Sequence, residues 1–364
     1  MSSIDTLVNN TIRPDVRAIA GYHVADASGF IKLDAMENPY HLPHHLREEL
    51  GRRLADAVLN RYPVASYATI KHSVRTTLGV PQGYDVILGN GSDELISILC
   101  MGCALQDRRA VVVAPTPSFV MYQRSAQFAG MDYVGVPLKA DLTLDLPAML
   151  AAIAEHKPAL VFLSYPNNPT GNLFAADDIV AIIKALDGFG LAIVDEAYEP
   201  FAQQTFMHRL PEFANLVVMR TVSKLGLAGI RLGYMSAAPQ LLEQFDKVRP
   251  PYNINVLTQV AAEFALDHVE VLNQQAAALR AARADLAAAL AAMPGVEVFP
   301  SAANFILIRV PNSDDAHVKL LSHKVLIKNV SKMHGVLTNC LRITVSTPEE
   351  NSAFLDAFAA SLAA

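Results

Sequence analysis

Several features that mark other classes of protein are missing from this sequence of 364 residues. It has no basic excess, because 29 Lys and Arg face 35 Asp and Glu and leave a formal net charge of −6. That balance disfavours nucleic acid and anionic membranes as partners. No uninterrupted apolar run reaches the length of a membrane span, and residues 1–15 lack a basic stretch followed by an apolar one. We therefore expect a cytoplasmic protein.

Cysteine is scarce, which excludes a disulfide framework and suits a reducing compartment. Cys100 and Cys103 form a C-x-x-C pair, and Cys340 stands alone. The pair could serve redox chemistry, but the apolar helical spacing around it favours two core cysteines. The histidines in 41–45 have a spacing typical of a solvated helix start, so we predict no metal site.

The sequence is rich in apolar residues, at 52%, and only 18% of its residues are charged, which predicts a large buried core. Continuous apolar, β-branched runs alternate with helix-like stretches such as 94–104 and 177–186. The strand-like runs are 85–89, 110–115, 159–166, 191–198 and 216–224. Strands that are apolar throughout are typical of a mostly parallel sheet covered on both faces, so we predict an α/β core.

The pattern changes after about residue 240. A long Ala-rich helix is predicted over 273–293, followed by strands and a final helix that opens at "TPEEN". The strands are predicted at 304–310, 325–330 and 340–345. We expect a large domain of 35–248 and a small α+β domain made of 1–34, an N-terminal arm, and 249–364. The boundary is marked by the prolines of "VRPPYNIN".

Unusual residues gather where the predicted strands end, which is where open α/β sheets bind ligands. "GNGSDE", residues 89–94, opens a helix whose free N–H groups would hold an anion, although an ordinary helix cap has the same composition. Phe119 and Tyr122 follow the next strand and would pack in the core or stack on a flat ring. "YPNNPTG" then adds Asn167 and Asn168, of which turn chemistry does not require both.

A carboxylate and an amine complete this set. Asp195 ends the apolar run "LAIV", where a carboxylate needs a cationic partner, either an arginine or a ring nitrogen. Lys224 follows "VVMRTVS"; it and Arg231 either reach solvent from an apolar element or lie desolvated. A desolvated amine has the lowered pKa that Schiff-base chemistry needs. These strand ends together supply an anion site, an aromatic ring, an amide, a carboxylate and an amine. Those are the contacts that pyridoxal phosphate needs for its phosphate, ring face, ring oxygen, ring nitrogen and aldehyde carbon.

Taken in order, "GNGSDE", "SYPNNPTG", "VDEAY" and "TVSK…GIRLGY" resemble the signature of the fold type I, class II aminotransferases. The resemblance runs from "DAMENPY" to "LRITVSTPEE", and "LNRYP", "VLIKNVS" and "CLRITVSTPEE" make the sequence most similar to the histidinol-phosphate aminotransferases. It implies a mostly parallel seven-stranded sheet in the large domain and pyridoxal 5'-phosphate as cofactor. It also implies transfer of an amino group between L-histidinol phosphate and 2-oxoglutarate, which gives imidazole acetol phosphate and glutamate in histidine synthesis.

The resemblance also implies roles for single residues. Lys224 would form the Schiff base with the cofactor and then move a proton, and Asp195 would pair with the ring nitrogen. Tyr198 and Asn168 would hydrogen-bond the ring oxygen, with Asn168 also near the substrate, while Phe119 would stack on the ring. The cofactor phosphate would be held by Ser92, Asp93, Thr221, Ser223 and Arg231.

Further residues are implied at the substrate and at a subunit interface. Tyr22, Lys328 and Arg342 would face the substrate's phosphate, and Arg342 would also bind a carboxylate of glutamate. The family works as a homodimer, in which Tyr62 of "NRYP" would reach the other subunit's site.

The sequence departs from the usual family pattern at three places. Arg231 follows Lys224 by seven residues rather than eight, so we expect a shortened turn that still presents the guanidinium. Met36 replaces the first asparagine of the usual "NENP", and Lys328 replaces an arginine, which bears on substrate identity.

The sequence leaves two alternative functions open. One is another fold type I enzyme with the same cofactor, an aromatic or aspartate aminotransferase or an amino-acid phosphate decarboxylase. The other is a Rossmann oxidoreductase, suggested by the α/β alternation alone, for which the G-x-G-x-x-G motif after the first strand is missing.

Overall fold

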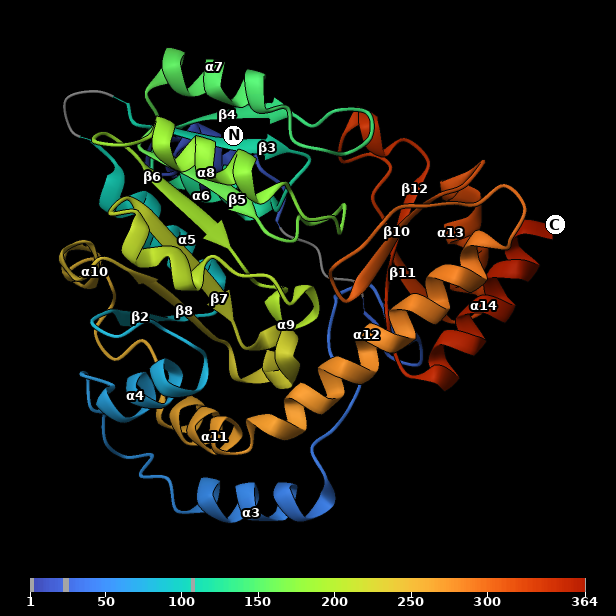
Figure 1. The fold of residues 1–364 in the computed structure, drawn as a ribbon, viewed down its shortest axis with the longest axis horizontal. Helices are drawn as coiled ribbons and strands as arrows, with labels where there is room; N and C mark the ends of the chain where they lie inside the picture. The colour runs from blue at the N-terminus through green and yellow to red at the C-terminus, as the bar shows by residue number, and fades with distance from the viewer. Residues whose placement is uncertain (1–2, 22–25, 106–108, 364) are drawn as a thin grey trace.

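The computed structural model of the chain describes residues 3–21, 26–105 and 109–363. Its centre is a seven-stranded sheet in the order β2-β8-β7-β6-β5-β3-β4 (Figure 1). The strands are β2 (Asp85–Asn90), β3 (Val111–Thr116), β4 (Asp132–Pro137), β5 (Leu160–Ser164), β6 (Leu191–Asp195), β7 (Leu216–Thr221) and β8 (Leu232–Ala237). Only β8 runs antiparallel to its neighbours in this sheet. The mostly parallel seven-stranded sheet is confirmed.

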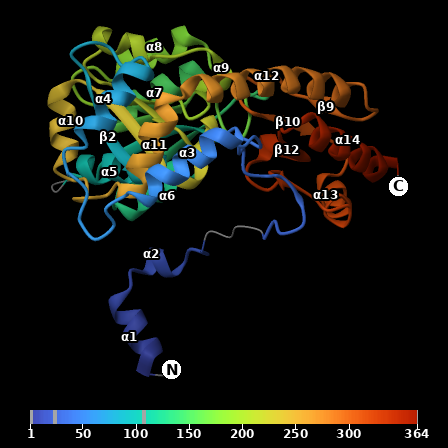
Figure 2. The same cartoon turned by 90° about the horizontal axis from the view of Figure 1, so that it is seen from below.

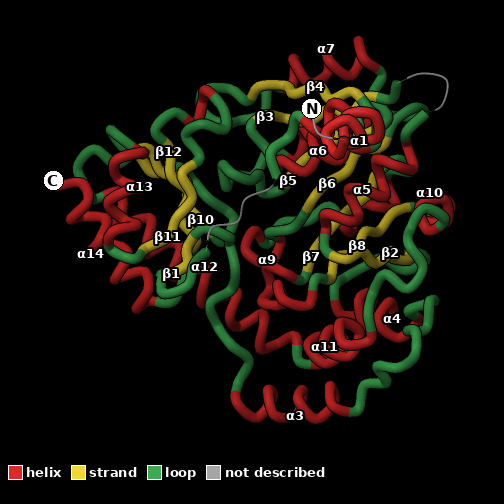
Figure 3. The backbone as a smooth tube through the Cα atoms, turned by 180° about the vertical axis from the view of Figure 1, so that it is seen from behind, coloured by secondary structure: helices red, strands yellow, loops and turns green. Residues whose placement is uncertain are grey.

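Helices cover both faces of this sheet, which explains why its strands are apolar on both sides. One face packs against α4 (Ala68–Thr77), α7 (Leu146–His156), α8 (Ala176–Ala185) and α11 (Val256–Asp267). The other face packs against α5 (Ser92–Cys103), α6 (Val120–Phe128) and α10 (Pro239–Asp246). Figure 3 shows the sheet from behind, between these helices.

A second sheet, in the order β1-β11-β12-β10-β9, forms the smaller unit beside the first. Its strands are β1 (Ile31–Leu33), β9 (Glu297–Val298), β10 (Phe305–Arg309), β11 (Val325–Asn329) and β12 (Cys340–Thr344). It packs with α12 (Val269–Ala291), α13 (Ser313–Ser322) and α14 (Pro348–Ala363). Because β1 pairs in parallel with β11, the N-terminal part of the chain is joined to the C-terminal unit.

The division into domains at residue 248 stays a prediction, and the packing of α11 favours a later boundary. This helix lies against α4 and α3 (His44–Ala55), and its Ala262 and Leu266 belong to the core of the large sheet. The helix that follows, α12, buries Leu279 and Leu286 in the core of the small unit. We therefore infer a boundary between α11 and α12.

The N-terminal helices α1 (Ser3–Thr11) and α2 (Pro14–Arg17) extend away from the rest of the chain, as Figure 2 shows. The guanidinium of Arg13 connects them to the body, because it donates to the carbonyls of Phe128 and Gln127 at 2.8 and 2.9 Å. Ile4 and Leu7 on α1 are exposed.

The C-x-x-C pair lies on α5, where Cys100 belongs to the buried core beside the sheet. Burial raises the pKa of both Cys100 and Cys103 to about 12, which disfavours a reactive thiolate. The core interpretation of the pair is therefore favoured. Within the described ranges, no helix is long and apolar enough to cross a membrane.

A glycine in β8 allows α5 to start close to the sheet. A Cβ on Gly233 would lie 2.8 Å from the carbonyl carbon of Gly91 and 2.9 Å from the nitrogen of Ser92. We expect Gly233→Ala to lower the free energy of unfolding by about 1–3 kcal/mol, because backbone atoms must move to make room.

Gly51, inside α3, provides the matched control, because a Cβ there meets nothing within 4 Å. Gly51→Ala should leave stability unchanged or raise it by up to about 1 kcal/mol. Urea unfolding of both variants measures these free energies. Equal stabilities of the Gly233→Ala and Gly51→Ala variants would contradict the close approach at Gly233.

Candidate active site

A pocket with a cavity volume of about 120 Å³ lies at the edge of the large sheet where its parallel strands end. Because β8 is antiparallel, its first residues reach the same edge, and Arg231 precedes it there. The pocket is lined by Met36, Ser92, Asp93, Phe119, Ser164, Asn168, Asp195, Ala197, Tyr198, Thr221, Ser223, Lys224 and Arg231. Most of the side chains predicted to bind the cofactor are thus brought together.

Lys224 lies in a tight π turn, Ser223–Leu227, directly after β7. Gly226 makes this turn with a φ of 132°, a conformation that other residues rarely adopt. The amine donates to the carbonyl oxygen of Ala35 at 3.0 Å. Burial, and then the charge of Arg342, lower the pKa of Lys224 to about 8. A larger share of this amine is therefore neutral, and nucleophilic, than of an exposed lysine.

Asp195 is the last residue of β6 and is 2% exposed. Its Oδ2 accepts a hydrogen bond from the Tyr122 hydroxyl at 2.7 Å, and its Oδ1 accepts one from the Ala197 amide at 3.1 Å. Burial nevertheless raises the pKa of Asp195 to about 6. A carboxylate desolvated to this degree gains most from a cationic partner, which a protonated ring nitrogen would supply.

A chain of hydrogen bonds leads from the small unit into the pocket. Arg342 Nη1 donates to Asn168 Oδ1 at 2.5 Å, and Asn168 Nδ2 donates to the Tyr198 hydroxyl at 3.1 Å. Arg342 Nη2 also donates to the carbonyl of Asp34 at 2.7 Å. Arg342, from β12, is thereby coupled to the two side chains expected at the ring oxygen.

Met36, which departs from the family pattern, also lines this pocket. Its φ is 52°, a left-handed conformation that asparagine adopts more readily than methionine. Its sulfur lies 3.6 Å from the Tyr198 hydroxyl, which donates to it. The thioether thus occupies space beside a predicted cofactor contact.

The start of α5 forms an anion cradle with the turn before β8. The first N–H groups of a helix have no partner within the helix and attract an anion. Arg231 Nη2 lies 3.3 Å from Asp93 Oδ2, and a Cβ on Gly91 would lie 2.6 Å from the same nitrogen. The shortened turn after Lys224 therefore still presents the guanidinium at the cradle. The hydroxyls of Thr221 and Ser223, 2.8 Å apart, complete it.

Two predicted site residues, Tyr62 and Lys328, lie outside the pocket lining. Tyr62 is 81% exposed and stacks on Tyr252, with 4.8 Å between ring centroids. Lys328 is exposed on β11 directly opposite Arg342, so both side chains point to the same face of the small sheet. Tyr22 lies outside the described residues.

Asn167, the first asparagine of the turn motif, supports the loops instead of facing the pocket. Asn167 Nδ2 donates to the Pro117 carbonyl at 3.0 Å and to the Thr170 hydroxyl at 2.7 Å. Its Oδ1 accepts from Ser118 at 2.8 Å. The two asparagines therefore have different roles, and only Asn168 lines the pocket.

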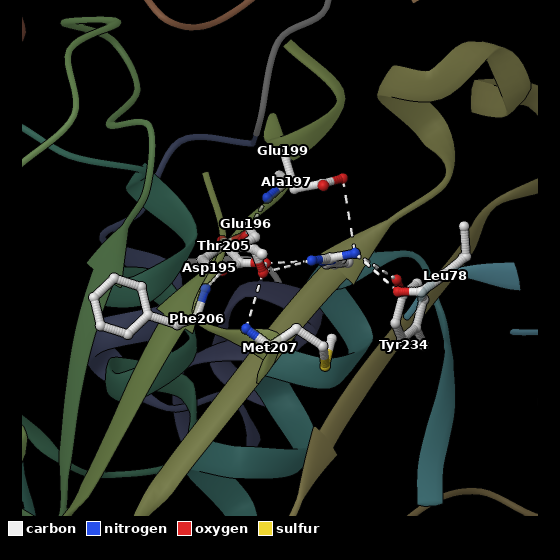
Figure 4. Close-up of polar contacts among 10 residues, drawn as sticks. Leu78, Asp195, Glu196, Ala197, Glu199, Thr205, Phe206, Met207 and Tyr234 are labelled. Atoms are coloured by element: carbon white, nitrogen blue, oxygen red, sulfur yellow. Dashed lines mark hydrogen bonds and ion pairs between the residues drawn. The ribbon is translucent and has the colours of Figure 1, made fainter. Parts of the chain in front are cut away.

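A buried ion pair that the sequence did not predict joins Arg220 and Glu196. Figure 4 shows the polar contacts around Glu196 and Thr205. Arg220 Nε donates to Glu196 Oε2 at 2.8 Å, and its Nη2 donates to the Thr205 hydroxyl at 2.7 Å. Glu196 also accepts from the amide of Phe206. The pair joins the ends of β6 and β7, next to Asp195 and Thr221 respectively. The only sequence signal was a charged residue directly beside a motif residue in each strand.

We expect Arg220→Met to cost about 3–5 kcal/mol of unfolding free energy, because Glu196 would remain buried without its cation. The control is Arg109→Met, which removes an exposed pair with Asp132 at 3.0 Å and should cost about 0–1 kcal/mol. Chemical denaturation measures both; similar losses in the two variants would contradict the importance of the buried pair.

The comparison with protein families agrees with this geometry. The model of the family described as aminotransferase class I and II matches residues 28–358. The chain belongs to this family. A relative from Cupriavidus pinatubonensis named histidinol-phosphate aminotransferase 2 is 61% identical over 366 residues, which cover 100% of both chains. A relative from Ralstonia nicotianae named histidinol-phosphate aminotransferase 1 is 60% identical over 363 residues, which cover 99% of this chain and 96% of the relative.

A solved structure shows the same fold. It is the histidinol-phosphate aminotransferase from Sinorhizobium meliloti in complex with pyridoxal-5'-phosphate. It is 22% identical, with a TM-score of 0.85 over 97% of this chain and 98% of that chain. Fold type I, the aminotransferase class and the pyridoxal phosphate cofactor predicted from the motifs are confirmed, and the oxidoreductase alternative is dropped. The roles of single residues stay predictions.

Proposed function

We propose that this aminotransferase moves an amino group between L-histidinol phosphate and 2-oxoglutarate, giving imidazole acetol phosphate and glutamate, in histidine biosynthesis. The relatives named for this activity support the proposal at 60% and 61% identity. The observation that carries the chemistry is the pocket itself, where a part-buried amine and a buried carboxylate lie beside an anion cradle. The substrate assignment rests on the cations that the small unit adds.

The residues of the pocket fit pyridoxal phosphate. The anion cradle at Ser92, Asp93 and Arg231 suits its phosphate, and the desolvated Asp195 suits its ring nitrogen. When bound, this cofactor supplies an aldehyde carbon and a ring that withdraws electrons from the substrate's Cα.

The chain's own side chains bind, orient and move protons around that ring. Lys224, with its lowered pKa, would bond to the cofactor through Nζ and, once released, accept and return the proton of the substrate's Cα. Asp195 would hold the ring nitrogen in its protonated form. Tyr198 and Asn168 would orient the ring oxygen, and Phe119 would lie against the ring face.

Two cations would select the substrate. Arg342 donates a hydrogen bond to Asn168, which lines the pocket. Lys328 lies opposite Arg342 on the same face of the small sheet. Histidinol phosphate lacks a carboxylate at Cα but carries a phosphate, which two cations hold better than one. Arg342 would also bind a carboxylate of glutamate, and Tyr22 would contact the substrate phosphate.

We also propose a cytoplasmic homodimer in which Tyr62 reaches the partner's cofactor phosphate. An exposed apolar surface around Tyr62 supports this arrangement. Its members are Val58, Leu59, Tyr62, Val64 and Tyr252, whose side chains are 43–81% exposed. Association of two copies would cover this surface.

The alternative is another enzyme of this fold that uses the same cofactor, an aromatic or aspartate aminotransferase or an amino-acid phosphate decarboxylase. Lys328, which replaces the arginine usual in the family, is the reason to retain this alternative. A lysine offers the substrate phosphate one point charge, whereas an arginine offers a forked contact. Assaying amines with and without a phosphate, together with release of carbon dioxide, separates these activities.

We expect Lys328→Ala to reduce kcat/KM for histidinol phosphate by roughly ten- to a hundredfold, because one charge-assisted bond to phosphate is lost. The half-reaction with glutamate should change much less. Arg342→Ala should impair both half-reactions, and Lys328→Arg should be tolerated. Steady-state kinetics of each half-reaction provides the measurement.

Lys332→Ala is the control, because Lys332 is 86% exposed and pairs only at the surface with Asp314 at 3.4 Å. It should leave both half-reactions unchanged. Equal losses for both substrates in Lys328→Ala, or a wild type that prefers unphosphorylated histidinol or an aromatic amino acid, would refute the substrate assignment and leave the aminotransferase class intact.

A further inference from the structure

We propose that Tyr122 is a positioning residue whose hydroxyl orients the Asp195 carboxylate and holds it in the charged form that a cationic ring nitrogen requires. The inference rests on the proposed function only in taking Asp195 as the partner of that nitrogen. It adds a residue on α6 that does not itself line the pocket.

The contact is short and completely enclosed. The Tyr122 hydroxyl donates to Asp195 Oδ2 at 2.7 Å, and the exposures of the two residues are 0% and 2%. The Ala197 amide holds Oδ1 from the other side at 3.1 Å. Because each oxygen accepts one bond, the carboxylate cannot rotate without losing one of them, and each oxygen keeps a lone pair for a further donor.

The Tyr122 ring is fixed by its aromatic neighbours. It stacks on Phe162 of β5, with centroids 4.6 Å apart and planes at 10°. It meets Phe119 edge-on, at 5.6 Å and 86°. Phe119 is the residue predicted to lie on the cofactor ring, so Tyr122 supports two cofactor contacts at once. Because the ring is held by these contacts, its hydroxyl cannot move to another hydrogen-bond partner without disturbing the packing.

The protonation states agree with a donor at Tyr122 and a charge at Asp195. Burial, and then the charge of Asp195, raise the pKa of Tyr122 well above its usual 10, so the hydroxyl stays protonated. At Asp195, burial raises the pKa, and the Tyr122 hydrogen bond is the largest effect that lowers it. The other charges facing this carboxylate, Asp93 from α5 and Glu196 beside it, raise its pKa further. Tyr122 is therefore the main side chain that keeps Asp195 ionised.

The test begins with the full-length protein without cofactor and the variant Tyr122→Phe, which keeps the ring and removes only the hydroxyl. The folded-state pKa of Asp195, about 6, lies above the ordinary 3.8 of an unfolded chain. Ionising this group therefore costs stability as pH rises from about 4 to 6. Without the Tyr122 hydroxyl, the pKa of Asp195 in the folded protein rises, and the loss of stability should continue above pH 6. The stability gap between wild type and variant should widen between about pH 5 and 8.

Two further variants make the result specific. In a protein that already carries Asp195→Asn, removing the Tyr122 hydroxyl should have the same effect at every pH, because the titrating group is gone. Tyr133→Phe removes a hydroxyl from a ring packed on the same apolar cluster, but from β4, three strands from β6 in the sheet. Its effect should not vary with pH. A gap for Tyr122→Phe that stays flat with pH, or that widens equally when Asp195→Asn is also present, would overturn the proposal.

Cofactor binding provides the second measurement. Tyr122→Phe should weaken the affinity for pyridoxal phosphate about tenfold near neutral pH. The difference in affinity from the wild type should become smaller as pH rises, because Asp195 of the variant then ionises. Unchanged affinity at neutral pH would overturn the positioning role. The cofactor-free comparison remains decisive even if the substrate assignment fails, because it reports the coupling of Tyr122 and Asp195 without any turnover.

Discussion

Asp195 and Lys224 lie at the ends of neighbouring strands in the same pocket, and burial shifts the two groups in opposite directions. It raises the pKa of Asp195 to about 6 and lowers that of Lys224 to about 8. A cationic ligand group would offset the cost of the buried Asp195 charge, and the lowered pKa makes more of the Lys224 amine neutral and nucleophilic. Pyridoxal phosphate has a ring nitrogen suited to the first and an aldehyde suited to the second, and we expect the start of α5 to receive its phosphate. The remaining architecture keeps these three contacts in fixed positions.

The supporting structure lies mostly below and beside the pocket. The Arg220–Glu196 pair joins the ends of β6 and β7, which fixes the backbone on which Asp195 and Lys224 are carried. Tyr122 holds the carboxylate from α6, and the carbonyl of Ala35 holds the amine from the segment that leads out of β1. The small unit contacts the pocket through Arg342, which donates a hydrogen bond to Asn168.

The sequence predicted the parts of the fold that are apolar and continuous. The five strand-like runs correspond to β2, β3, β5, β6 and β7, whose carboxyl ends carry the motifs. β4 and β8 were missed, because "DYVGVP" and "LGYMSA" contain glycine, proline and small residues that disfavour a strand by propensity, and pairing in the sheet determines their conformation. The contact between Tyr122 and Asp195 was also missed, since the two residues are far apart in the chain and only the packing of α6 on the sheet brings them together.

The central claim is that the cofactor is bound covalently to Lys224. Borohydride reduction of the holoenzyme, followed by peptide mapping, tests it most directly. We predict that the cofactor is fixed to the peptide that contains residue 224, and that Lys224→Ala keeps its unfolding transition but loses both the label and turnover. Labelling of a different lysine, or wild-type activity in Lys224→Ala, would contradict it.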